Sequence, residues 1–238
     1  MKNWQADLLA AQESVNCEKT LLKQIELAAI ALGFEYYAYG LRVPLPLSNP
    51  KMVILNNYPL AWQQRYMEQG YLRKDATVQH GRSSQTPIVW SNQVFASATD
   101  LWDEAQSFGL RHGWAQSSCA ANGVGGMLTL ARSRGVITAK ELQSKELKMR
   151  WLVQTSHNAL ARILSPKLGI GGGKLNLTQR EMEVLKWTAD GKTAGEISEI
   201  LALSENTVNF HIKNAVAKMG ASNKTAAVVR AAMLGFLN

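Results

Sequence analysis

Apolar residues at helical spacing open the chain and predict helices over residues 4–16 and 18–32. The period then changes, because residues 34–41 are rich in aromatic side chains and residues 52–58 in aliphatic ones, as is typical of strands. Three prolines in residues 43–51 predict a loop between these two strands. The start of the chain therefore combines both element types.

Helices and strands continue to alternate up to residue 165. Pro59 suits the first turn of a helix, and Gly109 suits the end of another. The expected elements are a helix over 59–69, a short strand over 87–90, a helix over 97–109, a hairpin of 113–120 with 126–132, and a long helix over 138–164. This mixture predicts an α+β fold: an α-β-α sandwich with an antiparallel five-stranded sheet.

A change in composition then marks a domain boundary. Residues 166–174 contain Pro166 and four glycines, a composition typical of a flexible linker. The sequence therefore predicts one domain over residues 1–165 and a second over residues 175–238.

The second domain shows capping signals at the start of each of its expected helices. Thr178 with Glu181, and Thr193 with Glu196, have the spacing of capping boxes. Ser204 can cap a third helix and Asn223 a fourth. Four short helices with a tight turn between the second and third predict a helix-turn-helix domain.

The third of these helices, residues 204–219, has two different faces. One face is apolar and consists of Val208, Ile212, Ala215 and Met219. The other carries Asn206, Asn209, Phe210, Lys213, Asn214 and Lys218. Asparagine pairs with adenine and lysine contacts guanine or phosphate, so this face could enter a DNA major groove. Alone, the pattern also fits an ordinary amphipathic helix; the caps and the tight turn favour DNA binding.

Composition restricts the classes of protein to which the chain can belong. The chain is 46% hydrophobic with seven Trp, which is sufficient for a packed core. No apolar run approaches the roughly 20 residues of a membrane span, and the N-terminus lacks a signal peptide's apolar stretch, so we expect a cytoplasmic protein without membrane contact. Cys17 and Cys119 match no metal or redox spacing, and the four histidines form no metal motif. We therefore expect no metal, no cofactor and no catalytic residues.

Net charge points to an acidic partner but does not locate its site. The formal charge of +8 favours nucleic acid. From Lys174 onward, however, eight Lys and Arg stand against six Asp and Glu, which leaves only +2. Bulk charge alone would not identify the helix-turn-helix region.

Residues 177–228 strongly resemble the output domain of LuxR-type regulators. Glu181, Leu185 and Gly191 match the family's signature positions, as do the strings GKT, EI and TVNFH. In that family the third helix reads DNA and the fourth contributes to dimerisation. The resemblance implies that Asn209, Phe210 and Lys213 face bases, and that Thr207, His211 and Lys218 touch phosphates or support the helix.

The first domain resembles the acyl-homoserine-lactone-binding subgroup of the same family, and is most similar to the QscR- and CepR-like receptors. The matching strings are NYPLAWQQRY, PIVW, LWDEAQSFGLRHG and GMLTLAR, together with Asp75. The resemblance implies a quorum-sensing transcription regulator. Its partners would be a small-molecule autoinducer, an N-acyl homoserine lactone; double-stranded DNA with a palindromic element, bound as a homodimer; and RNA polymerase.

The chemistry of such a ligand suits the residues at the matching positions. Asp75 can accept a hydrogen bond from the amide N–H, and the Trp62 indole can donate to the lactone carbonyl. The Tyr58 and Thr129 hydroxyls can donate to the acyl carbonyl. By resemblance, Tyr66 and Trp90 wall the head group, Ala105 and Leu110 border the ring, and Gly40, Leu101 and Trp102 are weaker candidates for the acyl-chain channel.

Each of these residues also has an ordinary structural interpretation. Trp62, Tyr66 and Trp90 could be core aromatics. Asp75, next to Arg73 and Lys74, could form a surface ion pair. Thr129 could bond a backbone carbonyl.

One position departs from the family pattern: Ala76 stands where the family has proline after the aspartate. Proline restricts the backbone, so alanine should leave this loop freer before ligand binds. We also expect the empty site to leave the Asp75 carboxylate buried without a partner, which would oppose folding until ligand arrives.

Two other classes of function remain open. An enzyme would need a nucleophile, and only Ser117, Ser118 and Cys119 near His112 suggest one, without a supporting motif. A helix-turn-helix transcription factor that senses a different small molecule, or acts without ligand, is the more serious alternative.

Overall fold

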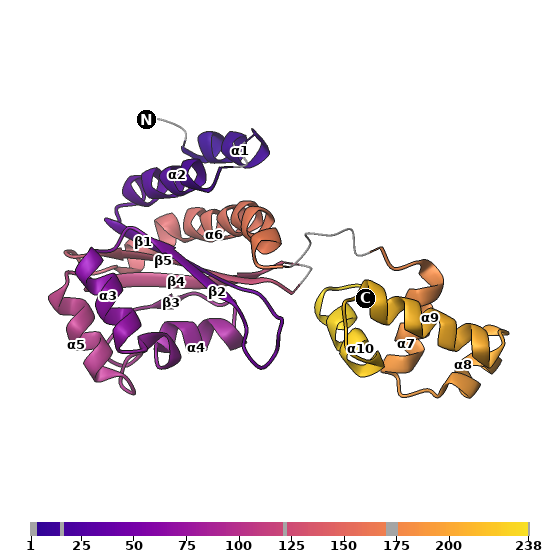
Figure 1. Ribbon diagram of the computed structural model, residues 1–238. Helices are drawn as coiled ribbons and strands as arrows, with labels where there is room; N and C mark the ends of the chain where they lie inside the picture. Colours follow the sequence, from indigo (N-terminus) through magenta and orange to yellow (C-terminus); the bar gives the residue numbers. More distant parts are fainter. Residues whose placement is uncertain (1–3, 15–16, 121–122, 170–175, 238) are drawn as a thin grey trace. The chain divides into compact units, whose positions relative to one another are not determined.

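The computed structural model describes residues 4–14, 17–120, 123–169 and 176–237 (Figure 1). The chain divides into two compact units. The first comprises residues 1–42, 52–120 and 124–165; the second comprises residues 166–238 with two short segments, 43–51 and 121–123.

The first unit is built on a five-stranded sheet in which all the paired neighbours are antiparallel. Its strand order is β2 (Met52–Asn56), β1 (Tyr36–Arg42), β5 (Gly125–Arg132), β4 (His112–Cys119) and β3 (Ile88–Val89). Helices cover both faces of this sheet (Figure 1). The predicted α-β-α sandwich is confirmed.

The two faces of the sheet differ in side-chain size. Residues paired across an antiparallel sheet lie on the same face, and successive residues of a strand alternate between faces. One face, here called the small-residue face, carries Ala38, Gly40, Gly113, Ala115, Thr129 and Ala131, together with the larger Tyr36 and Met127. The opposite, bulky face carries Tyr37, Tyr39, Leu41, Trp114, Leu128 and Leu130.

The bulky face packs against the long helix α6 (Ala139–Lys167), beyond which lie α2 (Glu18–Ala31) and α1 (Trp4–Ser14) (Figure 1). The fully buried His157 of α6 lies 2.8 Å, by its Nδ1, from the Tyr39 hydroxyl and 3.1 Å, by its Nε2, from the Val124 carbonyl oxygen. Burial lowers the pKa of His157, so the imidazole is neutral. In that form Nε2–H donates to the carbonyl and Nδ1 accepts from Tyr39.

Shorter helices cover the small-residue face. They are α3 (Leu60–Glu68), the 3₁₀ helix η1 (Tyr71–Arg73), α4 (Ala76–Ser83) and α5 (Thr99–Ser107). Gly81 brings α4 close to the sheet, because a Cβ there would lie 3.0 Å from the Met127 sulfur and 3.4 Å from the Ser117 Cβ. The sequence predicted neither η1 nor α4, since residues 70–86 lack a clear apolar period.

The second unit consists of α7 (Gln179–Ala189), α8 (Ala194–Leu201), α9 (Glu205–Lys218) and α10 (Lys224–Met233). All four predicted N-caps accept a backbone hydrogen bond, and Thr178 and Thr193 form complete capping boxes. Between α8 and α9, Ala202 adopts a left-handed conformation with φ of 52°, which turns the chain sharply. The predicted helix-turn-helix arrangement is confirmed.

The start of the expected linker is helical. Helix α6 continues through Pro166 to Lys167. Residues 170–174 of that linker lie outside the described residues, as do residues 15–16 of the first predicted helix.

Candidate ligand site and DNA-reading helix

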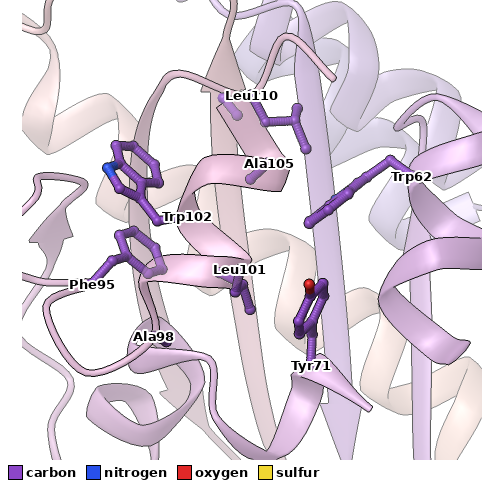
Figure 2. Packing of buried hydrophobic residues seen from close by; sticks show 9 residues of the cluster. Trp62, Tyr71, Phe95, Ala98, Leu101, Trp102, Ala105 and Leu110 are labelled. Carbon is purple, nitrogen blue, oxygen red and sulfur yellow. The ribbon is translucent and has the colours of Figure 1, made fainter. Parts of the chain in front are cut away.

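A buried aromatic cluster lies between α3, η1, α5 and the small-residue face. Its buried members are Trp62, Tyr71, Phe95, Ala98, Leu101, Trp102, Ala105, Leu110 and Ala131, and the partly buried residues against it are Tyr36, Tyr58, Tyr66, Ala76, Trp90, Val94 and Phe108. Figure 2 shows Leu101 and Ala105 of α5 in the middle, with Trp62 and Tyr71 on one side and the Phe95–Trp102 pair on the other. The Phe95 and Trp102 rings are stacked, with centroids 4.7 Å apart.

This cluster brings together most of the predicted ligand residues. Six of them belong to it or pack against it: Tyr58, Trp62, Tyr66, Trp90, Ala105 and Leu110. Thr129 is buried on β5 two residues before Ala131, and therefore on the same face of the sheet. Asp75 joins the group through a hydrogen bond from Tyr66. Residues separated by more than seventy positions thus share one region of the first unit.

Trp62 of α3 packs against three other aromatic rings. Its side chain is 3% exposed, and its ring lies 5.7 Å from Tyr66, 5.9 Å from Tyr71 and 5.5 Å from Phe108, centroid to centroid. Among the described residues, none accepts a hydrogen bond from its indole nitrogen. The ring therefore packs as a core aromatic would, and it keeps a donor for another group.

Asp75 is neither a surface ion pair nor an unpartnered carboxylate. It is the N-cap of α4: Oδ1 accepts from the Thr77 backbone N–H at 2.8 Å and from the Thr77 hydroxyl at 2.6 Å. Oδ2 accepts from the Tyr66 hydroxyl at 2.9 Å. The neighbouring Lys74 pairs with Asp100 instead. The expectation of an unpaired Asp75 in the empty protein is wrong, because the fold itself supplies three donors.

Two tyrosines near Asp75 are held as donors. Burial, and then the negative charge of Asp75, raise the pKa of Tyr58. The same causes raise the pKa of Tyr66 well above its ordinary value. Both phenols therefore remain protonated at neutral pH, and each can donate a hydrogen bond.

Ala76 also differs from its expected environment. It does not lie in a loop but is the first residue of α4, and it packs partly buried against the aromatic cluster. The first position of a helix tolerates proline well, because its N–H has no partner within the helix. The departure from the family pattern therefore falls at a position whose backbone is already ordered.

Trp90 lies flat on the backbone of Gly113. The Trp90 N–H donates to the Gly113 carbonyl at 2.8 Å, and a Cβ on Gly113 would lie only 2.2 Å from the indole ring. The Trp90 indole nitrogen is buried without a hydrogen-bond partner in the described chain. We did not select Gly113 from the sequence, although glycine inside a predicted strand is a signal of close approach.

Ion pairs join α3 and η1 to α5 at the edge of the cluster. Arg65 donates to both carboxylate oxygens of Glu104, at 2.7 and 2.6 Å, and Lys74 binds Asp100 one turn away. Arg65 lowers the pKa of Glu104, and Lys74 lowers that of Asp100. These residues, and the cluster members Tyr71, Phe95 and Phe108, were missed by the sequence analysis because contacts between helices leave no local pattern.

The weaker acyl-chain candidates fall into two groups. Leu101 and Trp102 belong to the aromatic cluster, and the Trp102 indole donates to Asn92 Oδ1 at 2.7 Å. Gly40 lies instead on the small-residue face, where a Cβ would meet no atom within 4 Å. The sheet is therefore open at Gly40.

In the second unit, α9 presents the predicted DNA-reading residues on its outer side. Val208 and Ala215 are fully buried, whereas Asn209, Phe210 and Lys213 are exposed. Phe210 is 60% exposed and lies two residues from Val208, almost opposite the buried stripe. Its ring contacts His211 edge-on with centroids 5.8 Å apart, and the Thr207 hydroxyl lies 2.8 Å from that of Ser204.

Lys218 has a structural partner. Its ammonium group donates to Oε2 of Glu181 at 2.8 Å, and Glu181 is also the capping-box residue of α7. The buried Glu181 carboxylate thus joins the start of α7 to the end of α9. Of the two roles that the resemblance allows for Lys218, this contact fits support of the helix.

The residues that could have suggested an enzyme do not form a nucleophile group. The Ser117 hydroxyl donates to the Ser84 carbonyl at 2.6 Å, and the Ser118 hydroxyl donates to Gln154 at 2.8 Å. His112 stands at the opposite end of β4 from Cys119. Within the described ranges, no group of three His, Cys, Asp or Glu side chains could hold a metal ion. No helix described here is both long and apolar enough to span a membrane.

Comparisons with known proteins agree with this architecture. The family described as "Autoinducer binding domain" matches residues 18–160, and "Bacterial regulatory proteins, luxR family" matches residues 175–231. The transcriptional activator protein AnoR of Acinetobacter nosocomialis is 46% identical over 239 residues and covers 100% of both chains.

Solved structures of similar proteins also agree with this architecture. SdiA of Escherichia coli, 36% identical, has a TM-score of 0.82 and covers 99% of this chain and 98% of its own. A second SdiA structure, in complex with octanoyl-rac-glycerol, has a TM-score of 0.81. CepR2 of Burkholderia cenocepacia, described as N-acylhomoserine lactone dependent, is 32% identical with a TM-score of 0.63, covering 68% of this chain and 95% of its own.

Proposed function

The chain belongs to the LuxR family of autoinducer-binding bacterial transcription regulators, and we propose that its own autoinducer is an N-acyl homoserine lactone. The family consists of regulators rather than enzymes. The observation that carries the proposal is Asp75: its carboxylate receives three hydrogen bonds from the chain and retains acceptor capacity next to a buried aromatic cluster. An amide N–H attached to an apolar chain fits that combination.

In the proposed complex, each polar group of the lactone meets a complementary group. The amide N–H donates to Asp75 Oδ2, and the Trp62 indole donates to the lactone carbonyl. The Tyr58 and Thr129 hydroxyls donate to the acyl carbonyl. Tyr66 and Trp90 wall the head group, with Ala105 and Leu110 beside the ring. Support comes from the packing of these residues around one cluster.

We propose that the acyl chain lies along the small-residue face. This face carries the short side chains of Ala38, Ala115 and Thr129 side by side. The open space at Gly40 supports this direction. Each methylene buried there would contribute about 0.8 kcal/mol, so ligand binding would stabilise the first domain by mass action.

We further propose two domains, residues 1–165 and 175–238, joined by a flexible linker over 166–174. The protein would bind a palindromic promoter element as a homodimer, act on RNA polymerase, and reside in the cytoplasm with the chromosome. We place the dimer surface of the first domain on the long helix α6, where Leu147 is 81% exposed. Helix α9 of each protomer would read one half-site.

An acylglycerol is the second candidate ligand. A glycerol hydroxyl can donate to Asp75 as an amide does, and SdiA is described in complex with octanoyl-rac-glycerol. The Asp75 carboxylate would accept from either donor, an amide N–H or a glycerol O–H. The two ligand classes therefore have to be compared directly.

Thermal unfolding tests the proposal. N-acyl homoserine lactones of several chain lengths should raise the melting temperature of the full chain, and at least one should promote operator binding. Asp75→Asn and Trp62→Phe should reduce both effects. Asp103→Asn, an exposed change on α5, serves as a matched control and should not. Absence of any shift across all chain lengths would contradict the proposal, and a larger shift with monoacylglycerols would favour the second candidate.

A further inference from the structure

We propose that Thr77 is a positioning residue for the ligand, one that orients the Asp75 carboxylate before the ligand arrives. This inference rests on the proposed function, since it assigns Asp75 the role of acceptor for the amide N–H. Thr77 itself need not touch the ligand. Its role is to determine which oxygen of Asp75 remains available.

Three hydrogen bonds from the chain occupy most of the acceptor positions of the Asp75 carboxylate. Both donors of Thr77, its N–H at 2.8 Å and its hydroxyl at 2.6 Å, bind the same oxygen, Oδ1. Tyr66 binds the other oxygen, Oδ2, at 2.9 Å. A carboxylate offers about four acceptor positions. The chain therefore occupies both positions on Oδ1 and leaves the remaining one on Oδ2.

Two donors on one oxygen also restrict rotation of the carboxylate. The terminal torsion of an aspartate is normally broad, so a freely rotating group would have to be ordered when a ligand binds. The Thr77 hydroxyl removes much of that freedom in advance. Its removal should therefore weaken recognition of the amide more than it weakens contacts elsewhere in the ligand.

Thr77 is itself held firmly by its surroundings. It is 2% exposed, and it lies one turn before Gly81 on the side of α4 that packs against Met127 and Ser117 of the sheet. The hydroxyl therefore has a fixed position from which to donate. A hydroxyl on the exposed side of α4 would exchange with water and could not orient Asp75.

The position of Ala76 makes this contact more important. Proline at that position would restrict the backbone next to the aspartate, and alanine does not. The Asp75 orientation in this chain consequently depends on its three hydrogen bonds, of which the one from the Thr77 hydroxyl is the shortest. In this proposal the Thr77 contacts take over the ordering role of the proline ring.

A pair of ligands separates this role from a general effect on folding. One is the N-acyl homoserine lactone whose chain length gives the largest melting shift. The other is its ester isostere, in which oxygen replaces the amide N–H and no donor faces Asp75. Dissociation constants for both are measured on the full chain by competition against a fluorescent acyl homoserine lactone. The informative quantity is the preference for amide over ester within each variant, because lost stability affects both ligands equally.

Thr77→Val removes the hydroxyl and keeps the shape and the backbone N–H. It should lower the preference for the amide by about 3–10-fold, which corresponds to the loss of one ordinary hydrogen bond. Thr77→Ser keeps the hydroxyl and should remain within about 2-fold of the wild type. Thr99→Val, an exposed control on α5, should also leave the preference unchanged. If Thr77→Val folds poorly, Thr77→Ala gives the same comparison.

The outcomes are distinguishable. Equal weakening of both ligands by Thr77→Val, or no weakening, would overturn the positioning role while leaving the proposed function intact. Failure of the wild-type chain to bind either compound would overturn the proposed function, and the role of Thr77 with it. In an Asp75→Asn background the Thr77→Val effect should vanish, and its persistence would also count against the proposal.

Discussion

At Asp75, one carboxylate serves both the fold and the proposed ligand site. It caps α4 through Thr77 and accepts from Tyr66. Charged groups that accept several hydrogen bonds are costly to leave incomplete when buried. Substitution of Asp75 should therefore affect stability as well as binding, whereas Asp103→Asn removes an exposed carboxylate charge without disturbing this turn.

Ala76→Pro is expected to increase both the stability of the protein and its affinity for the ligand. Ala76 is the first residue of α4, and Asp75 is already extended with ψ of 114°, close to what a following proline requires. The substitution should raise the free energy of unfolding by about 0.4–1 kcal/mol and increase lactone affinity accordingly. Denaturation and titration of the purified chain measure both. Unchanged or weaker affinity would contradict this prediction.

Gly113→Ala is expected to displace Trp90. The added Cβ would lie 2.2 Å from the indole ring, so the ring must move. We expect a loss of about 1–3 kcal/mol of stability from overpacking and weaker ligand binding, both measured by thermal unfolding with and without lactone. Gly125→Ala is the matched control, because a Cβ at this glycine of β5 would lie 4.0 Å from the Arg42 carbonyl oxygen and would meet nothing nearer. Similar losses from both substitutions would show that the Trp90 contact is not the cause.

Phe210→Ala is expected to reduce sequence-specific DNA binding. The exposed Phe210 ring lies at the centre of the outer face of α9, where it can contact the 5-methyl group of thymine. Replacing individual thymines of the operator by deoxyuridine removes only that methyl group. At one position this change should weaken wild-type binding by about 0.8 kcal/mol, as expected for one buried methyl-sized group, and leave the Phe210→Ala variant unaffected. Gel-shift titrations would detect the difference, and equal effects on both proteins would exclude the contact.

Among the elements, the caps were the easiest to predict and the contacts between helices the hardest. A capping box is a local pattern, so Thr178, Thr193 and Ser204 could be read from spacing alone and are confirmed. The pairing of Glu181 with Lys218 could not, because it joins residues 37 positions apart. The contact between Gly113 and Trp90 could not be predicted for the same reason, because the two residues lie on different strands or their ends.

The start of α6 depends on an ion-pair network that should make stability depend on pH. Glu141 accepts from Arg132 at 2.7 Å and from Lys145 at 2.7 Å, and Arg132 in particular lowers its pKa to about 2. Because the folded-state pKa is depressed, this stabilisation is present above pH 4.5 and is lost as pH falls toward 2.

Glu141→Gln should therefore destabilise the protein by about 1–3 kcal/mol at neutral pH. The difference from the wild type should shrink in acid, as urea denaturation at several pH values would show. Glu146→Gln, which disrupts a more exposed pair with Arg150 on the same helix, should cost no more than about 1 kcal/mol. A difference at Glu141 that does not change with pH would indicate lost packing rather than lost charge.

For the whole molecule, periodicity predicted the two architectures, whereas the site depended on resemblance. The sandwich and the four capped helices follow from local patterns. Asp75, Trp62 and Thr129 look like ordinary core or surface residues until they are compared with a family. The division of the sheet into small-residue and bulky faces could in principle have been read from β1 and β5, where glycine, alanine and threonine alternate with tyrosine and leucine, once the strand register was known.

The most direct test of the central claim is mass spectrometry of the ligand that co-purifies with the full chain from cells supplied with a mixture of N-acyl homoserine lactones. We predict recovery of a lactone from a narrow range of chain lengths, near one molecule per protomer, with Asp103→Asn behaving as the wild type. Asp75→Asn and Trp62→Phe should recover much less. Recovery of no lactone, or of an acylglycerol in its place, would contradict the account.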